Sequence, residues 1–306
     1  MNSQQLYSHY INIGKFLVFF HVIWYNYTVN SMIDLHTHSN ASDGSLSPTQ
    51  LIEKAAFLGL KALALTDHDT VSGLEEAELA VKSTEIRFIR GVELEILSDL
   101  SGEFHLLGLG LRTLTDEFHT ALENLAGTRE RRNLMMVEKI RSAGIDANYE
   151  EIKAFAGTIV ARPHFGAFLI SRKLVKNQEQ AFKRWLGKGR PFYVPKEGLE
   201  ISKAARIIHE CGGAAILAHP MSLHVSWGRL PGLIVNLKEQ GLDGIEAWHP
   251  TARVTDCKRL EKLGLSLGLF ISAGSDFHGS VRPERKLGFT AGDRKITDDF
   301  LFEGLL

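Results

Sequence analysis

Seven short apolar runs, each with a histidine or carboxylate at or near its end, constrain the fold of this chain more than any other feature. The runs are rich in Ile, Leu, Val and Ala, and they lie at 32–38, 62–69, 86–95, 103–111, 214–220, 243–250 and 269–278. Short, nearly continuous apolar runs are typical of strands buried on both faces, as in parallel sheets covered by helices.

Helical segments lie between several of these runs. The segment 48–60 begins with Pro48 directly after Ser47, a favourable N1 and N-cap pair. Further helices are expected at 201–213, which ends in a glycine pair, and at 230–242 and 252–265. The alternation predicts right-handed βαβ units in a parallel sheet or barrel. The short connection between the runs 86–95 and 103–111 instead predicts a hairpin.

The stretch 112–200 interrupts this alternation, because its pattern predicts helices only, near 116–143, 149–156, 163–175 and 178–186. It carries 16 Lys and Arg against 11 Asp and Glu, although the whole chain has a net charge of −1. We therefore predict an α/β barrel formed by residues 32–111 and 201–306, with an inserted helical subdomain at 112–200. The positive charge of the insertion suggests that it faces an anionic substrate.

Residues 1–31 are predicted to be an N-terminal extension outside the working domain. Their apolar run 16–27 is shorter than the roughly 20 residues that a membrane-spanning helix needs, and it lacks the features of a signal peptide. A weak membrane anchor is the alternative interpretation. The two cysteines, Cys211 and Cys257, have no CxxC partner, which favours a reducing cytoplasm. The net charge provides no global basic field for stable binding of double-stranded DNA.

Side chains that can bind metal occur in all seven runs. His36 and His38 are two residues apart on a predicted strand, so both project from the same face. Taken singly, each residue has an ordinary explanation; Asp43 before Gly44, for example, is a common turn pair. Functional groups of parallel barrels gather at the carboxyl ends of the strands, so we expect these side chains to converge. The set consists of His36, His38, Asp43, His68, Glu93, His105, His219, His249, Asp276 and His278.

The motifs DLHTHSNASDG, LALTDHDT, GVELE, AILAHP and SAGSDFHG resemble the successive motifs of the PHP (polymerase and histidinol phosphatase) family. The likeness covers essentially all of 32–280, and it is greatest to the small stand-alone phosphoesterases of that family. Those enzymes act on nucleoside 3′,5′-bisphosphates and on the 5′ ends of short RNAs. The resemblance implies a distorted (β/α)7 barrel of the PHP type that holds two or three divalent metal ions.

The resemblance also implies three groups of metal ligands. These are His36, His38, Glu93 and Asp276; Glu93, His105 and His219; and Asp43, His68 and His278. Asp276, His278, Glu93 and His68 are expected to be the catalytic residues. A nitrogen and oxygen set without thiolates suits Mn, Zn or Fe. The implied reaction is in-line attack on phosphorus by a metal-bound hydroxide, which needs no serine or cysteine nucleophile.

Four residues are expected to contact substrate. Arg162 and His164, in ARPHFG, begin a predicted helix, where backbone N–H groups favour phosphate and an arginine fork fits it. A surface arginine and a packed histidine are the alternative. Lys196 is a weaker candidate, and His249 lies outside the shared ligand pattern. Asp69 is expected to orient a ligand, and the cluster 129–132 is expected to be a solvated helix face.

Three other functions fit parts of the pattern. A phosphatase of the histidinol phosphate type would use the same scaffold. An amidohydrolase also begins with an HxH motif, but it usually has a metal-bridging lysine where this sequence has Glu93. A non-catalytic metal-binding module would lack several ligands, whereas the set here is complete. The sequence gives no indication of the oligomeric state.

Overall fold

The computed structural model describes residues 30–100, 102–156, 160–195, 197–302 and 305, and two short antiparallel strands, β1 (Asn12–Ile13) and β2 (Phe16–Leu17). The chain divides into two compact units, Met1–Asn30 and Ser31–Leu306. Most of the apolar run 16–27 lies outside the described residues, so its interpretation stays a prediction. Among the helices of the described residues, none has the length and apolar character needed to cross a membrane.

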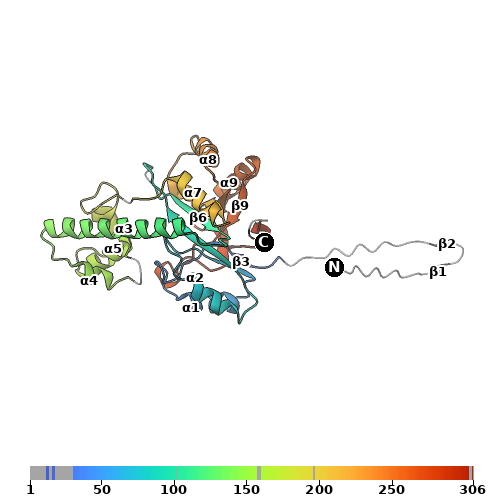
Figure 1. The fold of residues 1–306 in the computed structure, drawn as a ribbon, viewed down its shortest axis with the longest axis horizontal. Helices are drawn as coiled ribbons and strands as arrows, with labels where there is room; N and C mark the ends of the chain where they lie inside the picture. The colour runs from blue at the N-terminus through green and yellow to red at the C-terminus, as the bar shows by residue number, and fades with distance from the viewer. Residues whose placement is uncertain are drawn as a thin grey trace. The chain divides into compact units, whose positions relative to one another are not determined.

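All seven predicted strands are present and form a single sheet (Figure 1). Their order in the sheet is their order in the chain: β3 (Ile33–Asp34), β4 (Ala62–Leu65), β5 (Arg87–Glu95), β6 (His105–Leu109), β7 (Ala214–Leu217), β8 (Gly244–Trp248) and β9 (Phe270–Ala273). Neighbouring strands are parallel except for β6, which runs antiparallel to both β5 and β7. The predicted hairpin of 86–95 and 103–111 is therefore confirmed.

The last strand returns to the first and nearly closes the sheet into a barrel. Just beyond β9, the Asp276 N–H donates to His36 O at 2.9 Å, and the His38 N–H donates to Phe277 O at 2.9 Å. Gly274 allows this approach, because a Cβ atom there would lie 2.2 Å from His36 Cβ. The predicted distorted seven-stranded barrel is confirmed, and its closure brings the ends of β3 and β9 together.

Five helices pack around the barrel: α1 (Pro48–Phe57), α2 (Leu74–Val81), α7 (Ile201–Glu210), α8 (Leu230–Glu239) and α9 (Val254–Ser266). The Ser47 side chain caps α1 by accepting from the Gln50 N–H, as its sequence predicts. The sequence analysis missed α2, whose N-cap residue Gly73 supplies no side-chain hydrogen bond. Shorter elements complete this part: η2 (Pro220–Leu223), η3 (Gly279–Val281), η4 (Ala291–Asp293), η5 (Asp298–Phe300), β10 (Phe289–Thr290) and β11 (Arg294–Lys295).

The stretch between β6 and α7 is helical, as predicted. It contains α3 (Asp116–Ser142), α4 (Tyr149–Lys153), α5 (Arg162–Ser171), α6 (Gln178–Ala181) and the π-helical turn η1 (Phe182–Leu186). The long helix α3 runs from the barrel to α4 and α5 (Figure 1). Its first half buries Phe118 and Leu125 in the core of the barrel, whereas Met136 and Ile140 lie in a separate helical core. Domain boundaries at 112 and 200 stay a prediction.

Candidate metal centre and active site

The topology of the barrel brings all nine predicted metal ligands to one mouth. His36, His38 and Asp43 follow β3, His68 follows β4, and Glu93 lies near the end of β5. His219, Asp276 and His278 follow β7 and β9. His105 opens β6, and because β6 is antiparallel to its neighbours its first residue lies opposite Glu95, at the end of β5. The antiparallel strand β6 therefore brings His105 to the mouth with its first residue, whereas its parallel neighbours do so with their last residues or the loops that follow them.

Four atoms form the first group of donors, which lies at the centre of the mouth. The Nε2 atoms of His36 and His38 are 3.1 Å apart, and each lies 3.3 Å from Glu93 Oε2. Asp276 Oδ1 lies 3.6 Å from His36 Nε2 and 3.2 Å from His38 Nε2. In a tetrahedral zinc site with bonds of 2.0–2.1 Å, neighbouring donors are separated by about 3.3 Å. Five of the six separations within the group therefore lie close to the spacing of a tetrahedral metal site.

The second group shares Glu93 with the first. Its other oxygen, Oε1, lies 2.9 Å from His105 Nδ1 and 2.8 Å from His219 Nε2. The two histidine nitrogens are 3.3 Å apart. One carboxylate therefore presents one oxygen to each of two donor groups, which is the arrangement of a ligand that bridges two ions.

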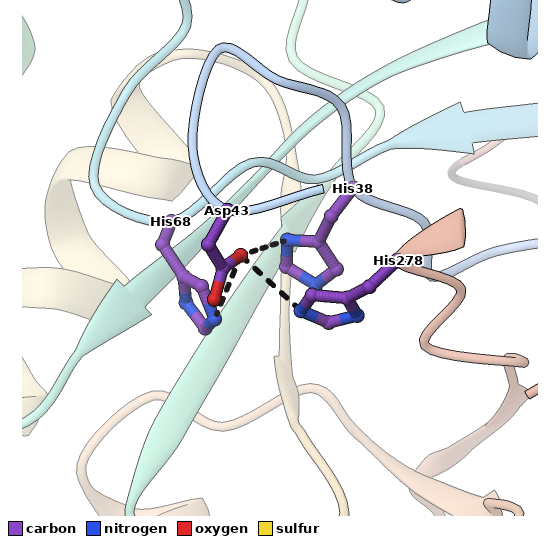
Figure 2. A group of neighbouring side chains, drawn as sticks. All are labelled: His38, Asp43, His68 and His278. Carbon is purple, nitrogen blue, oxygen red and sulfur yellow. Dashed lines mark ion pairs between the residues drawn. The ribbon is translucent and has the colours of Figure 1, made fainter. Parts of the chain in front are cut away.

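The third group is centred on Asp43 (Figure 2). Its Oδ1 lies 3.2 Å from His278 Nε2, 3.9 Å from His68 Nε2 and 4.0 Å from His38 Nδ1. Figure 2 shows the three imidazoles turned toward this one oxygen. The spacing is wider than in the first group, but one donor atom from each of the four residues lies within 4.8 Å of the others.

The chemistry of these donors fits divalent metal ions. Glu93 Oε2, His38 Nδ1 and His278 Nε2 are buried without a hydrogen-bond partner among the described residues. Burial raises the pKa of the Glu93 carboxyl, but the surrounding histidines outweigh this effect and hold that pKa well below its usual range. Buried polar groups are costly unless they are paired or coordinate a metal. An ionised carboxylate among histidine nitrogens that lack hydrogen bonds is suited to such coordination.

Glu246 supports two of the ligands, and the sequence analysis missed it. It lies in the middle of β8 and is completely buried. Its Oε1 lies 2.9 Å from His36 Nδ1, and its Oε2 accepts the His219 N–H at 2.7 Å. A carboxylate on the far nitrogen of a ligating histidine fixes its tautomer and ring orientation. The signal in the sequence was a carboxylate flanked by apolar residues in the middle of the run 243–250.

The loop that carries Asp43 is tied down by Asp67. Asp67 Oδ1 accepts the Ser39 N–H at 2.8 Å, and Oδ2 accepts the Ser39 hydroxyl at 2.6 Å. The Ser42 hydroxyl donates to Asp67 Oδ1 as well. This carboxylate therefore fixes both ends of the turn that leads to Asp43, and the sequence analysis did not identify it.

Unusual backbone conformations concentrate at the mouth. Asp69, His219 and Asp276 have positive φ angles of 50°, 29° and 50°. Such conformations cost non-glycine residues about 1–3 kcal/mol each and persist where the surrounding structure enforces them. Asp276 is held from the other side by Arg285, which donates to the Asp276 backbone oxygen at 2.9 Å and forms an ion pair with its carboxylate. The surrounding protein therefore fixes the positions of these residues without the help of a bound metal.

The four predicted substrate-binding residues differ in their location and contacts. His249 lines a cavity of about 290 Å³ at the mouth, and its Nε2 lies 3.1 Å from Asp276 Oδ2. Arg162, the first residue of α5, lines an adjoining cavity and lies over the Tyr193 ring at 5.4 Å. His164 Nδ1 accepts the Ala161 N–H at 2.9 Å, so this ring nitrogen caps the helix. Lys196 lies outside the described residues.

Two expectations about charged residues are wrong. The cluster 129–132 is not a wholly solvated helix face, because Arg132 is buried and Arg129 forms an ion pair with Asp69. Asp69 does not serve to orient a ligand: its Oδ1 accepts the Glu95 N–H at 2.8 Å and its Oδ2 pairs with Arg129. Asp69 therefore joins the barrel to α3. The helical sequence pattern alone could not reveal the burial of Arg132 or the ion pair of Arg129, because both arise where α3 packs against the barrel.

Comparisons with known proteins identify the family of this chain. The family model described as PHP domain matches residues 34–194. A 5′-3′ exoribonuclease of Haemophilus influenzae is 38% identical over 245 residues, which are 80% of this chain and 89% of the relative. A 3′,5′-nucleoside bisphosphate phosphatase of Chromobacterium violaceum is 32% identical over 260 residues, 84% of this chain and 91% of the relative.

A solved structure shares the fold of this chain over most of the length of both proteins. It is described as an amidohydrolase from Chromobacterium violaceum with bound sulfate, and its TM-score is 0.78 at 30% sequence identity. The superposition covers 86% of this chain and 92% of the other.

Proposed function

This chain belongs to the PHP domain family, and we propose that it is a metal-dependent phosphoesterase that hydrolyses phosphate esters of nucleotides. The substrates we propose are nucleoside 3′,5′-bisphosphates and the 5′ ends of short RNAs, as the names of the two relatives indicate. The observation that carries the proposal is the position of Glu93, whose two carboxylate oxygens each lie within a separate group of histidine donors.

The proposed cofactors are two or three ions of Mn, Zn or Fe, held by the three donor groups described above. Bound divalent ions would activate water for attack on phosphorus and neutralise the phosphoryl oxygens. Glu93, Asp276, His68 and His278 are the proposed catalytic residues, because they lie on the cavity into which a phosphate ester must enter. Glu246 and Arg285 are proposed to act indirectly, Glu246 by fixing the His36 ring and Arg285 by fixing the Asp276 carboxylate.

The residues around the donors provide contacts for an anionic substrate. Arg282 lines both the mouth cavity and the adjoining cavity that contains Arg162. We assign His249 to the phosphate that is hydrolysed, because it shares the mouth cavity with Asp276. Arg162 is assigned to a more distant part of the substrate, with His164 and Lys196 as further proposed contacts. We propose that the enzyme works in the cytoplasm, where nucleotides and RNA fragments are available.

Phosphate release from purified protein in Mn²⁺ tests the proposal. Three substrates distinguish its parts: adenosine 3′,5′-bisphosphate, a short 5′-phosphorylated RNA and histidinol phosphate. We expect turnover of the two nucleotide substrates, abolition by excess chelator and recovery on addition of Mn²⁺. Faster hydrolysis of histidinol phosphate would favour the alternative activity, and full turnover in excess chelator would contradict the metal requirement.

A further inference from the structure

His105 of the second donor group lies between two carboxylates, one at each nitrogen of its ring. Its Nδ1 atom lies 2.9 Å from Glu93 Oε1 and 3.3 Å from His219 Nε2, so this nitrogen faces the other donors. Its Nε2 atom lies 3.2 Å from Glu95 Oε2. The groups of donor atoms that lie within 4.8 Å of one another among the described residues do not include Glu95. Glu95 therefore contacts a ligand of the centre without being one of the donors.

The pattern Glu-Leu-Glu at the end of β5 produces this arrangement. Glu93 and Glu95 are two residues apart on a strand, so their side chains project from the same face of the sheet. His105 is the residue of β6 directly opposite Glu95 in the antiparallel register, and side chains at opposed positions lie next to each other. The imidazole thus extends between the two carboxylates. Only 9% of Glu95 is exposed, so its contact with His105 is largely shielded from water.

The backbone of Glu95 is anchored on both sides. Its N–H donates to Asp69 Oδ1 at 2.8 Å, and its carbonyl oxygen accepts the Leu199 N–H at 3.0 Å. Asp69 is itself held by its ion pair with Arg129 of α3. A backbone that is fixed in this way limits the positions that the Glu95 side chain can reach, which favours a lasting contact with His105.

The charge of Glu95 also acts on the helical insertion. Glu95 and Arg132 of α3 line the same cavity. Burial lowers the pKa of the Arg132 guanidinium to about 10, and the Glu95 carboxylate partly offsets this effect. Glu95 therefore lies between a histidine of the metal centre and a cation of the insertion. A nearby cation and a hydrogen-bond donor both favour the ionised form of a carboxyl group.

The contact with Glu95 determines which nitrogen of His105 can bind a metal ion. An ionised carboxylate can only accept hydrogen bonds, so the proton of His105 lies on Nε2 and the lone pair of Nδ1 is left for the ion. A carboxylate at the far nitrogen also makes a ligating histidine more basic. The far nitrogen of His219 instead lies 2.6 Å from Ser222 Oγ, whose hydroxyl donates to Glu103 O at 3.0 Å. Of the two histidines in the second group, His105 is the one whose far nitrogen contacts a carboxylate.

We propose that Glu95 is a positioning residue of the metal centre. It holds His105 in the tautomer whose Nδ1 binds the ion of the second donor group, and its negative charge tightens the binding of that ion. The inference rests on the proposed function, which places divalent ions at this centre. It deepens that function by making the affinity of one ion depend on a residue outside the ligand set.

The test is the substitution Glu95→Gln, which keeps the shape of the side chain and an oxygen acceptor but removes the charge. The matched control is Glu197→Gln, since Glu197 is an exposed carboxylate that lines a small cavity together with Glu95. Metal-free protein is titrated with Mn²⁺ by calorimetry, and metal content is measured by mass spectrometry. Glu95→Gln should raise the Kd of one ion by roughly 10- to 100-fold. The other ions, and the control, should bind as in the wild type.

A double substitution shows whether Glu95 acts through His105. In His105→Asn, the amide oxygen can take the place of Nδ1, but no atom replaces Nε2. Glu95→Gln should therefore have almost no further effect on Mn²⁺ affinity when it is added to His105→Asn. Residues that act independently would instead give losses that add.

The outcomes distinguish this inference from the proposed function. Equal weakening of all ions, or additive losses in the double variant, would make Glu95 a general structural residue and overturn the inference. Unchanged Mn²⁺ binding in Glu95→Gln would also overturn it, as would the loss of one ion at every Mn²⁺ concentration, which would make Glu95 a ligand. Failure of the wild type to hydrolyse any nucleotide would instead refute the proposed function, because the titration does not depend on turnover.

Discussion

The barrel mouth and the helical insertion meet at adjoining cavities but supply them with different kinds of charge. The mouth gathers histidine nitrogens and carboxylate oxygens, the donors that divalent cations prefer. The insertion presents arginines, led by the buried Arg132. Under the proposed function, this difference would assign the cations to the barrel and the anionic substrate to the insertion.

The two regions are also stabilised in different ways. The mouth is fixed by backbone hydrogen bonds across the closing strands and by the approach that Gly274 allows. The insertion has its own core, and α3 connects that core to the core of the barrel. A change in the barrel mouth should therefore abolish chemistry, whereas a change in the insertion should alter substrate preference or local stability.

Asp276→Ala should produce the largest effect, because it removes a donor of the first group and a partner of Arg285. Metal ions contribute several kcal/mol to transition-state stabilisation, and a loss of about 4 kcal/mol corresponds to a roughly thousand-fold lower kcat/KM. Metal content should fall with activity for every substrate. Asp293→Ala, at an exposed carboxylate paired with Lys286, is the control. Full metal content with normal turnover in Asp276→Ala would remove this residue from the centre.

Phe168→Ala tests the independence of the two cores. Phe168 is 1% exposed in the core of the insertion, and truncating a buried phenylalanine costs about 3–5 kcal/mol. Denaturant unfolding should show this loss, while the folded protein should retain its metal and its hydrolysis of monophosphates. If metal is lost at temperatures where the protein remains folded, the two regions are more tightly coupled than their separate cores suggest.

Glu246→Gln should have an intermediate effect that is confined to the barrel. The substitution preserves shape but removes the negative charge next to His36 Nδ1. Loss of such a supporting carboxylate typically lowers metal affinity about 10- to 100-fold, which metal titration monitored by activity and calorimetry can measure. Excess metal should restore turnover, unlike in Asp276→Ala. Glu261→Gln, which affects a carboxylate that accepts the Trp248 Nε1–H, serves as the control.

The same contrast explains what the sequence could predict. Strand periodicity and helix caps identify the seven strands and α1, and the rule that strand ends converge brings His36, Glu93 and Asp276 together. Glu246 was open to prediction, because a lone carboxylate inside an apolar strand must find a partner. The burial of Arg132 was not open to prediction. It depends on how α3 packs against Val160 and the barrel, and a charged helix face gives no local sign of such burial.

The smallest expected effect concerns a second ion pair that links α3 to the barrel helices. Arg206 of α7 contacts Glu117 of α3, and both side chains are about half exposed, at 50% and 45%. Exposed pairs contribute roughly 0–1 kcal/mol, because water already solvates both charges well. Arg206→Ala should therefore change the free energy of unfolding by less than about 1 kcal/mol and leave kcat/KM unchanged for both nucleotide substrates.

Arg129→Ala removes the partner of a buried carboxylate, Asp69, and should cost clearly more stability in the same denaturant titration. Similar losses for both variants would show that burial does not distinguish the two links, and that the attachment of α3 is governed by its apolar contacts instead.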